Sequence, residues 1–229
     1  PEYSTNLSST SPTNRLITSL FHKSRILKLL KYGIVYVEKS NKDGIIEIQK
    51  HVMRYQQFFA TLAIENTLDK NIKKGVIWHT QGSGKSFSMV FYAGNMIKML
   101  LNPTILVVTD RNDLDNQLYE TFYKCSEFLK QKPVQADTRS DLKELLKDRV
   151  AGGVFFTTLQ KFEEESGLFS DRDDILVLVD EAHRSHYGLE ATVKLNLETM
   201  EAYKKYGTAK FLHDALPNAI YIGFTGTPV

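Results

Sequence analysis

The sequence has 229 residues, a formal net charge of +2 and a pI near 8.6, with 42% hydrophobic and 24% charged residues. This composition is ordinary for a globular protein with a buried core, and the length allows one large domain, with or without an attached arm. Strongly basic domains lie above about pI 9, so charge alone does not indicate nucleic acid binding. A single cysteine excludes an internal disulfide and favours a reducing, intracellular location. No apolar run approaches the roughly 20 residues that span a bilayer.

The N-terminal part of the chain predicts a linker, a helix and a hairpin. Residues 1–14 are polar, rich in Ser and Thr, and contain two prolines, which is typical of a linker or tail. Leucines and isoleucines recur at mostly helical spacing over Arg15–Lys31. Ile34–Glu38 and Ile45–Gln49 flank the turn signal Asn41–Gly44 and predict the two strands of a hairpin.

From His51 onward, helical stretches alternate with short, almost purely apolar runs. These runs are Gly75–His79, Thr104–Thr109, Val154–Thr157, Ile175–Val179 and Ala219–Gly223. Continuous apolar runs are typical of strands that are buried on both faces of a parallel sheet. The alternation predicts an α/β fold, a mostly parallel sheet with helices on both faces. We therefore divide the chain into an arm at residues 15–50 and a main domain at residues 51–229.

Helices are predicted in the segments between these strands. They are Ser86–Leu101, Leu114–Leu129, Asp141–Arg149, Leu189–Tyr206 and a shorter one near Ala209–Ala215. The aromatic residues Trp78, Phe155 and Phe156 lie in the apolar runs and are predicted core residues rather than platforms for stacking bases. Cys125 has no histidine near it in sequence, so we interpret it as a small apolar helix residue rather than a nucleophile.

Polar, charged or glycine-rich residues follow each apolar run. The clusters are Thr80–Ser86, Asp110–Asp115, Thr158–Phe162, Asp180–His183 and Phe224–Pro228. In open α/β sheets, ligands bind at the edge where the carboxyl ends of the strands lie. Five such clusters on one edge therefore predict a functional site there.

The first cluster predicts a phosphate-binding loop. Residues 79–86 read H-T-Q-G-S-G-K-S between a predicted strand and a predicted helix, which is the context that a P-loop requires. Gly82 and Gly84 let backbone N–H groups point into one hollow, and the helix N-terminus adds positive potential. Lys85 can reach the β- and γ-phosphates, and the Ser86 hydroxyl can bind Mg²⁺. We expect the remaining loop residues to line the nucleotide, and these are Thr80, Gln81 and Ser83. His79 stands where the general pattern has its first glycine.

The cluster after Ile175–Val179 reads D-E-A-H and predicts the hydrolysis site. Asp180 continues the strand and would hold Mg²⁺ through water, while Glu181 would polarise the attacking water. His183 and His186 are three residues apart, but their order is not H-E-x-x-H and cysteine ligands are absent, which disfavours a zinc site. We expect His183 instead to link the nucleotide site to the polynucleotide site or to a second lobe.

The P-loop, D-E-A-H and Thr225-Gly226-Thr227-Pro228 occur in the order found in superfamily 2 helicases and translocases. With the tracts at 78–86, 109–114, 157–162, 180–185 and 223–228, the chain from about Phe21 to Val229 resembles the restriction (R) subunit of type I restriction-modification enzymes. The resemblance implies the first RecA-like lobe of a motor that uses ATP and Mg²⁺ to translocate double-stranded DNA before cleavage. It implies a prokaryotic cytoplasmic protein whose partners are the methyltransferase and specificity subunits, and a longer chain with an upstream nuclease domain and a second motor lobe.

The same resemblance implies roles for further residues. Arg54 and Gln57 match the motif that recognises adenine, and the Gln57 amide can donate and accept hydrogen bonds. Thr225, Gly226 and Thr227 would couple the state of the nucleotide to lobe movement. Sequence-independent contacts to the DNA backbone are expected from Arg111, Asn112, Thr158, Gln160 and Lys161. An arginine finger, worth about 10³–10⁵ in rate, belongs to the second lobe in these motors, so this chain alone should hydrolyse ATP very slowly.

Two alternatives remain open from the sequence. A DEAH-type RNA helicase lobe predicts ATPase activity that RNA stimulates more than duplex DNA does. A scaffold module predicts nucleotide binding without turnover in the full-length protein.

Overall fold

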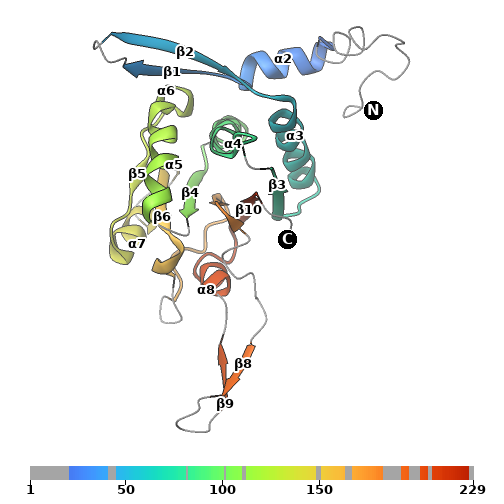
Figure 1. The fold of residues 1–229 in the computed structure, drawn as a ribbon. Coiled ribbons are helices and arrows are strands. Elements are labelled where there is room, and N and C mark those ends of the chain that lie inside the picture. Colours follow the sequence, from blue (N-terminus) through green and yellow to red (C-terminus); the bar gives the residue numbers. More distant parts are fainter. Residues whose placement is uncertain are drawn as a thin grey trace.

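A six-stranded parallel sheet forms the centre of the molecule (Figure 1). The computed structural model describes residues 21–40, 45–80, 82–100, 102–109, 112–147, 151–162, 167–182, 192–195, 202–205 and 208–226. The strands are β3 (Lys74–Trp78), β4 (Thr104–Thr109), β5 (Val134–Gln135), β6 (Val154–Thr158), β7 (Ile175–Val179) and β10 (Ile220–Thr225). They lie in the order β3-β10-β7-β4-β6-β5, and every neighbouring pair is parallel. The predicted fold class is therefore confirmed.

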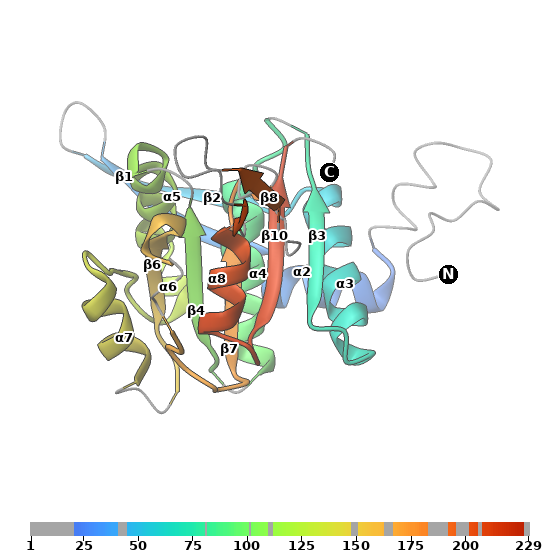
Figure 2. The ribbon, with the colours of Figure 1, turned by 90° about the horizontal axis from the view of Figure 1, so that it is seen from below.

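Helices cover both faces of this sheet (Figure 2). They are α3 (Tyr55–Asp69), α4 (Lys85–Met99), α5 (Asn112–Lys124), α6 (Ser126–Leu129), α7 (Arg139–Lys147) and α8 (Thr208–Ala215), with a 3₁₀ turn at Leu159–Lys161. Successive strand residues point to opposite faces, so Ile105 and Val107 of β4 pack with α3 to α6, while Leu106 and Val108 pack with α7 and α8. The single helix predicted at Leu114–Leu129 is divided at Cys125, which is buried in the turn between α5 and α6 rather than within a helix as predicted.

The N-terminal arm packs onto the same core. It consists of α2 (Lys23–Tyr32), β1 (Ile34–Ser40) and β2 (Ile46–Val52). β1 and β2 are antiparallel, so the predicted hairpin is confirmed, while residues 1–20 lie outside the described part of the chain. Val35, Val37 and Met53 belong to the core cluster that α4 helps to form. β2 runs through the boundary that we predicted at His51.

The prediction of a helix at Leu189–Tyr206 is wrong. The described residues in this segment form two short antiparallel strands, β8 (Thr192–Leu195) and β9 (Ala202–Lys205), with Thr192 opposite Lys205. A local helical pattern does not reveal pairing between strands, and the β-branched Thr192 and Val193 favour extended backbone. The shorter helix predicted at Ala209–Ala215 is confirmed as α8.

The prediction that Trp78 lies in the core is also wrong, whereas Phe155 and Phe156 are buried as predicted. β3 is an edge strand with β10 as its one neighbour in the sheet, and its residues alternate between exposed and half-buried. Trp78 is 58% exposed and Val76 is 52% exposed. An apolar run thus predicted the strand correctly but overstated its burial. In the described part of the chain, no helix is long and apolar enough to cross a membrane.

Candidate functional site

The loop between β3 and α4 has the backbone that a phosphate-binding loop needs. Gly82 and Gly84 adopt positive φ angles of 77° and 84°, which side chains rarely tolerate. A Cβ at Gly84 would also lie 3.0 Å from Gln57 Nε2, whereas open space surrounds Gly82. Gly84 is the N-cap of the 15-residue helix α4, so the loop wraps the positive end of a long helix dipole. An anion would be stabilised at this position.

A buried hydroxyl supports the same interpretation. Ser83 Oγ is buried and has no hydrogen-bond partner among the described residues, and Gln81 lies outside them. Buried polar atoms are normally hydrogen-bonded, so this hydroxyl is suited to bond a polar ligand that enters the loop. Thr80 is exposed, and Ser86 is half-buried in the first turn of α4.

Lys85 and Glu181 meet across the site, although 96 residues separate them in the chain. Lys85 Nζ donates to Glu181 Oε1, and both side chains are mostly buried. The contact arises because β10 alone lies between β3 and β7, so the loop after β3 and the acidic pair after β7 share one sheet edge. The sequence led us to expect this shared edge. Glu181 has a φ angle of 46°, a left-handed conformation that costs energy in a residue other than glycine.

Asp180 is held by the neighbouring strand. Its backbone N–H donates to Val108 O at 2.9 Å, and its Oδ1 accepts a hydrogen bond from Glu181 N at 2.9 Å. β7 is fully buried between β10 and β4 up to this point. Two carboxylates are thus fixed at one strand end, with Asp180 supported by β4 and Glu181 directed at Lys85.

Arg54 and Gln57 already contact the loop. Gln57 is buried at the start of α3, where its Oε1 accepts from Arg54 N at 2.8 Å and its Nε2 donates to Gly84 O at 3.0 Å. Arg54 Nη1 donates to Gly82 O at 3.4 Å. An amide can make two hydrogen bonds at each end, so Gln57 retains capacity for a ligand while it supports the loop. Adenine recognition by these residues stays a prediction.

His79 is a functional candidate that sequence reasoning passed over. The residue is only 7% exposed, its backbone N–H donates to Thr225 O at 2.9 Å, and its Nδ1 lies 3.4 Å from Ser88 Oγ. Burial lowers the pKa of His79, a hydrogen bond to the Gln56 backbone opposes this shift, and the charge of Lys85 adds to it. We treated His79 as a departure from the general P-loop pattern. A bulky, polar residue in a slot that usually holds glycine was the available signal.

The predicted coupling residues are only partly described. Thr225 is completely buried at the end of β10, and Gly226 O accepts a hydrogen bond from Trp78 Nε1 at 3.3 Å. The hydrogen bond from Trp78 to Gly226 ties the end of β10 to β3, the strand that precedes the phosphate loop. His183 and Thr227 lie outside the described residues.

The residues predicted to contact DNA differ in how exposed they are to solvent. Thr158 is buried, Gln160 is exposed, and Lys161 Nζ donates to Ala136 O. Asn112 begins α5, and Arg111 lies outside the described residues. A phosphate contact by Lys161 would therefore replace an existing hydrogen bond, and DNA contact by this set stays a prediction.

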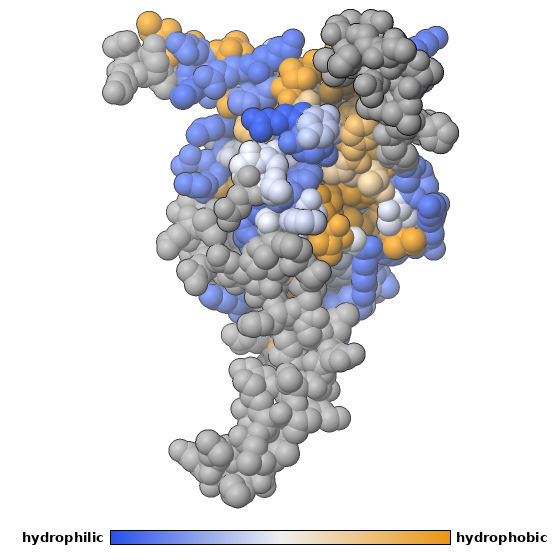
Figure 3. Space-filling view, turned by 45° about the vertical axis from the view of Figure 1, so that its right-hand side comes forward, coloured by the Kyte–Doolittle hydropathy of each residue, from blue (hydrophilic) through white to orange (hydrophobic). Residues whose placement is uncertain are grey.

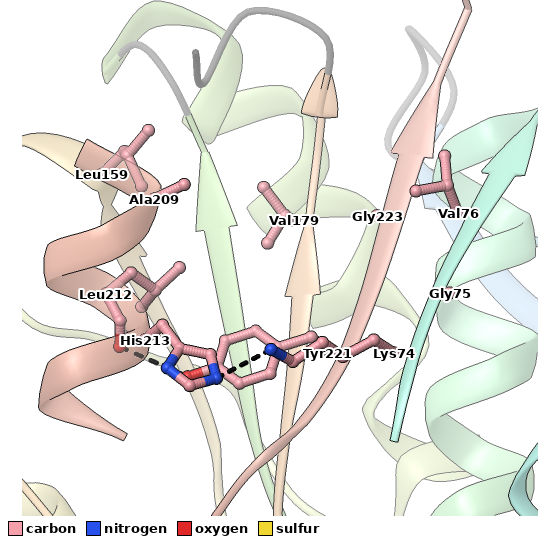
Figure 4. Close-up of a pocket in the computed structure, with 10 residues that line it drawn as sticks. All are labelled: Lys74, Gly75, Val76, Leu159, Val179, Ala209, Leu212, His213, Tyr221 and Gly223. Atoms are coloured by element: carbon pink, nitrogen blue, oxygen red, sulfur yellow. Dashed lines mark hydrogen bonds between the residues drawn. The ribbon is translucent and has the colours of Figure 1, made fainter. Parts of the chain in front are cut away.

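An apolar groove lies on the sheet face next to α8 (Figure 4), and no residue of the loop after β3 lines it. It has a volume of about 330 Å³ and is lined by Lys74, Gly75, Val76, Leu159, Val179, Ala209, Leu212, His213, Tyr221 and Gly223. At one end Lys74 Nζ lies 2.8 Å from His213 Nε2, and the His213 ring stacks on Tyr221. Burial, and secondarily Lys74, lower the pKa of His213, while Asp214 opposes the shift. The groove contains none of the predicted site residues.

Comparison with known proteins places these features in context. Residues 56–229 match the family model described as SWI2/SNF2 ATPase. The chain is 43% identical over 227 residues to the type I restriction enzyme HindI endonuclease subunit of Haemophilus influenzae, covering 93% of this chain and 21% of that protein. It is 32% identical over 233 residues to the putative type I restriction enzyme MjaIXP endonuclease subunit of Methanocaldococcus jannaschii, covering 93% and 19%.

These relatives confirm the predicted resemblance to R subunits, although the chain spans only about a fifth of their length. Among solved structures, the Sulfolobus solfataricus SWI2/SNF2 ATPase core in complex with dsDNA matches with a TM-score of 0.52 and 18% identity. The match covers 75% of this chain and 31% of that chain. At this identity it supports the RecA-like fold alone.

Proposed function

Because the chain belongs to the SWI2/SNF2 ATPase family, we propose that it is the ATP-binding motor lobe of a type I restriction enzyme R subunit. In this proposal, ATP hydrolysis drives translocation along double-stranded DNA before the complete enzyme cleaves it. The observation that carries the proposal is the contact between Lys85 of the phosphate loop and Glu181 after β7. This contact joins a phosphate-binding group and a candidate general base in one site.

In the nucleotide-free lobe, Lys85 and Glu181 neutralise each other's charge by forming an ion pair. Each charge is mostly buried, and a partly buried charge without a partner is costly. When phosphates reach the loop, Lys85 gains anionic oxygens as partners, and Glu181 becomes available to orient and deprotonate water. The pocket therefore changes from a self-paired to a hydrolysis-competent arrangement only when the substrate is present.

The residues present also fit a divalent cation. The Ser86 hydroxyl and the Asp180 carboxylate are the hard oxygen ligands that Mg²⁺ prefers. Mg²⁺ held there would neutralise charge on the β- and γ-phosphates. Asp180 is suited to this task because its position is fixed by the hydrogen bond from its backbone N–H to Val108 O.

The names of the relatives support a proposal for the partners. Two of them are named as endonuclease subunits of type I restriction enzymes, and the structural neighbour was solved with dsDNA. We propose methyltransferase and specificity subunits as partners, together with a second motor lobe and a nuclease domain in the full-length chain. The proposed location is the prokaryotic cytoplasm.

The test uses the full-length subunit assembled with its partner subunits. ATP hydrolysis is measured without nucleic acid, with duplex DNA and with RNA, for the wild type, Lys85→Ala and the control Lys70→Ala. Lys70 is an exposed residue at the end of α3. The proposal predicts hydrolysis that duplex DNA stimulates, a loss of at least about 100-fold in Lys85→Ala, and wild-type activity in Lys70→Ala.

Two results would contradict the proposal. Stimulation by RNA rather than by duplex DNA would favour an RNA helicase lobe. Nucleotide binding without turnover in the assembled complex would favour a scaffold module.

A further inference from the structure

We propose that His79 is a positioning residue that, through the Ser88 hydroxyl, holds the Gly84 carbonyl and so keeps the phosphate loop formed before the nucleotide binds. The inference rests on the proposed function, since it concerns how the same loop binds ATP. It assigns to His79 a role that the general P-loop pattern, with glycine at this slot, cannot supply.

The backbone at position 79 does not require glycine. His79 is absent from the residues with positive φ, whereas Gly82 and Gly84 later in the loop both have it. The slot is therefore open to any side chain on conformational grounds. What occupies it is a histidine that is 93% buried, a residue type that is usually only partly buried unless its polar atoms find partners.

The ring lies against α4, the helix that the loop caps. Its Nδ1 is 3.4 Å from Ser88 Oγ, and the same hydroxyl donates to Gly84 O at 3.1 Å. Ser88 is itself buried. Because the one hydroxyl proton is donated to Gly84 O, the ring joins this chain by donating from a protonated Nδ1 to Ser88 Oγ. The hydroxyl then links the ring to the loop carbonyl.

The Gly84 carbonyl is the point where several supports converge. It accepts hydrogen bonds from Ser88 N at 3.0 Å, from Ser88 Oγ, and from Gln57 Nε2 at 3.0 Å. Gly84 has a positive φ angle, and glycine adopts positive and negative φ angles about equally readily. The orientation of the Gly84 carbonyl therefore depends on these hydrogen bonds. α3 and α4, the latter through a Ser88 side chain that His79 contacts, thus hold one peptide group where the phosphate loop joins α4.

The backbone of His79 extends the connection to a third element. Its N–H donates to Thr225 O at 2.9 Å, so the residue lies between the end of β10 and the start of the loop. Burial lowers the pKa of His79, a hydrogen bond to the Gln56 backbone opposes this shift, and the charge of Lys85 adds to it, so the neutral ring is favoured near pH 7. A neutral ring leaves Lys85 as the cation that meets the phosphates.

This arrangement preorganises the loop, and preorganisation improves affinity by reducing the ordering that binding requires. Loss of the His79 link should therefore weaken nucleotide binding and leave the chemical step nearly unchanged. We expect the dissociation constant for a non-hydrolysable ATP analogue to rise about tenfold, the effect of losing one buried hydrogen bond, with kcat at saturating ATP changed less than about threefold.

The experiment compares variants of the full-length subunit in complex with its partners, with affinity and kcat measured for each. His79→Gly installs the general pattern, His79→Leu keeps bulk without hydrogen bonding, and His79→Asn places an amide atom near the position of Nδ1. Glycine and leucine should each weaken binding about tenfold, and asparagine should restore it to within about threefold of wild type. Ser88→Ala should weaken binding as leucine does, and the double variant His79→Leu with Ser88→Ala should be no weaker than either single variant.

A packing role would give a different pattern. In that case leucine would bind as wild type does and asparagine would bind as poorly as glycine, and either result overturns the inference. Additive losses in the double variant would overturn it as well. Ser88→Ala keeps the test valid if a His79 variant fails to fold. Failure of the proposed function looks different, because the wild type itself would then show no nucleotide binding that Lys85→Ala removes.

Discussion

β7 and β3 each bring one half of the candidate site to the same sheet edge, but their surroundings differ. β7 lies between β10 and β4, and all five of its residues are buried. β3 pairs with β10 alone, and it exposes Val76 and Trp78. Figure 3 shows apolar side chains gathered at the surface on the side of the molecule that carries α3 and β3. One half of the site is thus supported by packing and the other by an edge strand.

The difference indicates that the two halves are held by different forces. The acidic pair after β7 inherits its position from a buried strand and from the hydrogen bond that Asp180 N donates to Val108 O. The phosphate loop after β3 depends on hydrogen bonds that cross between elements, at Thr225, at Gly226 and at Gly84. We therefore expect substitutions at β7 to alter stability, and substitutions around β3 to alter loop geometry and ligand binding.

The largest expected effect is catalytic and comes from Glu181, which follows β7 but is not part of the strand. Glu181→Gln keeps the size of the side chain but removes the general base, so ATP turnover should fall by about 10²–10⁴-fold while nucleotide binding persists. Turnover and binding are measured on the full-length complex. Glu120→Gln, an exposed residue of α5, is the control and should retain wild-type turnover. Unchanged turnover in Glu181→Gln would remove Glu181 from the chemistry.

A matched pair of valines tests the difference in packing. Val177 of β7 is completely buried, whereas Val76 of β3 is 52% exposed. Val177→Ala should lower the free energy of unfolding by about 2–3 kcal/mol, because it removes buried methyl groups and leaves a cavity, and Val76→Ala should lower it by less than about 1 kcal/mol. Denaturant unfolding of the chain measures both values. Equal losses would mean that β3 is as enclosed as β7.

The ionisation of Cys125 tests whether water reaches the core around β7. It belongs to the core cluster that also contains Leu176 and Leu178 of β7, and burial raises its pKa to about 12 from 9.0. Because the folded pKa is raised, the thiol contributes stability that is fully present below pH 9.0 and is lost as the pH rises toward 12. At pH 10 the loss should be about 1.4 kcal/mol, and Cys125→Ala should lack this component. The comparison is made by denaturant unfolding at pH 8 and pH 10. Identical pH dependence in both proteins would mean that the thiol is accessible to water in the folded state.

The smallest expected effect is a change in tryptophan fluorescence, which reports how exposed β3 is to solvent. Trp78 is the one tryptophan of the sequence and is 58% exposed on β3. Its fluorescence in this chain should therefore resemble that of a solvated indole and should be quenched readily by acrylamide. Emission shifted to the blue and protected from quencher would place Trp78 in a core, as the sequence had suggested.

The sequence predicted the elements of the site better than their surroundings. The strands and the loop were predictable because apolar runs and glycine spacing are local signals, and β4, β6 and β7 match them closely. The order of strands in the sheet depends on crossovers between distant segments, so the edge position of β3 and the exposure of Trp78 were not visible. β5 has only two residues, too few to give a pattern.

Side-chain contacts between separate helices, strands and loops were also not predictable from the sequence. Nothing local indicates that Gln57 Nε2 donates to Gly84 O or that His79 lies beside Ser88, because the first contact joins α3 to the start of α4 and the second joins the loop after β3 to α4. The pairing of Lys85 with Glu181 was foreseeable, since both follow strands whose ends must share an edge in a parallel sheet.

The most direct test is a crystal structure of the full-length subunit with Mg²⁺ and a non-hydrolysable ATP analogue. The account predicts that the β- and γ-phosphates lie in the loop at residues 82–86, that Lys85 Nζ has left Glu181 for the phosphate oxygens, and that Glu181 faces the γ-phosphate. A nucleotide bound away from this loop, or a Lys85–Glu181 ion pair that persists with the nucleotide bound, would contradict it.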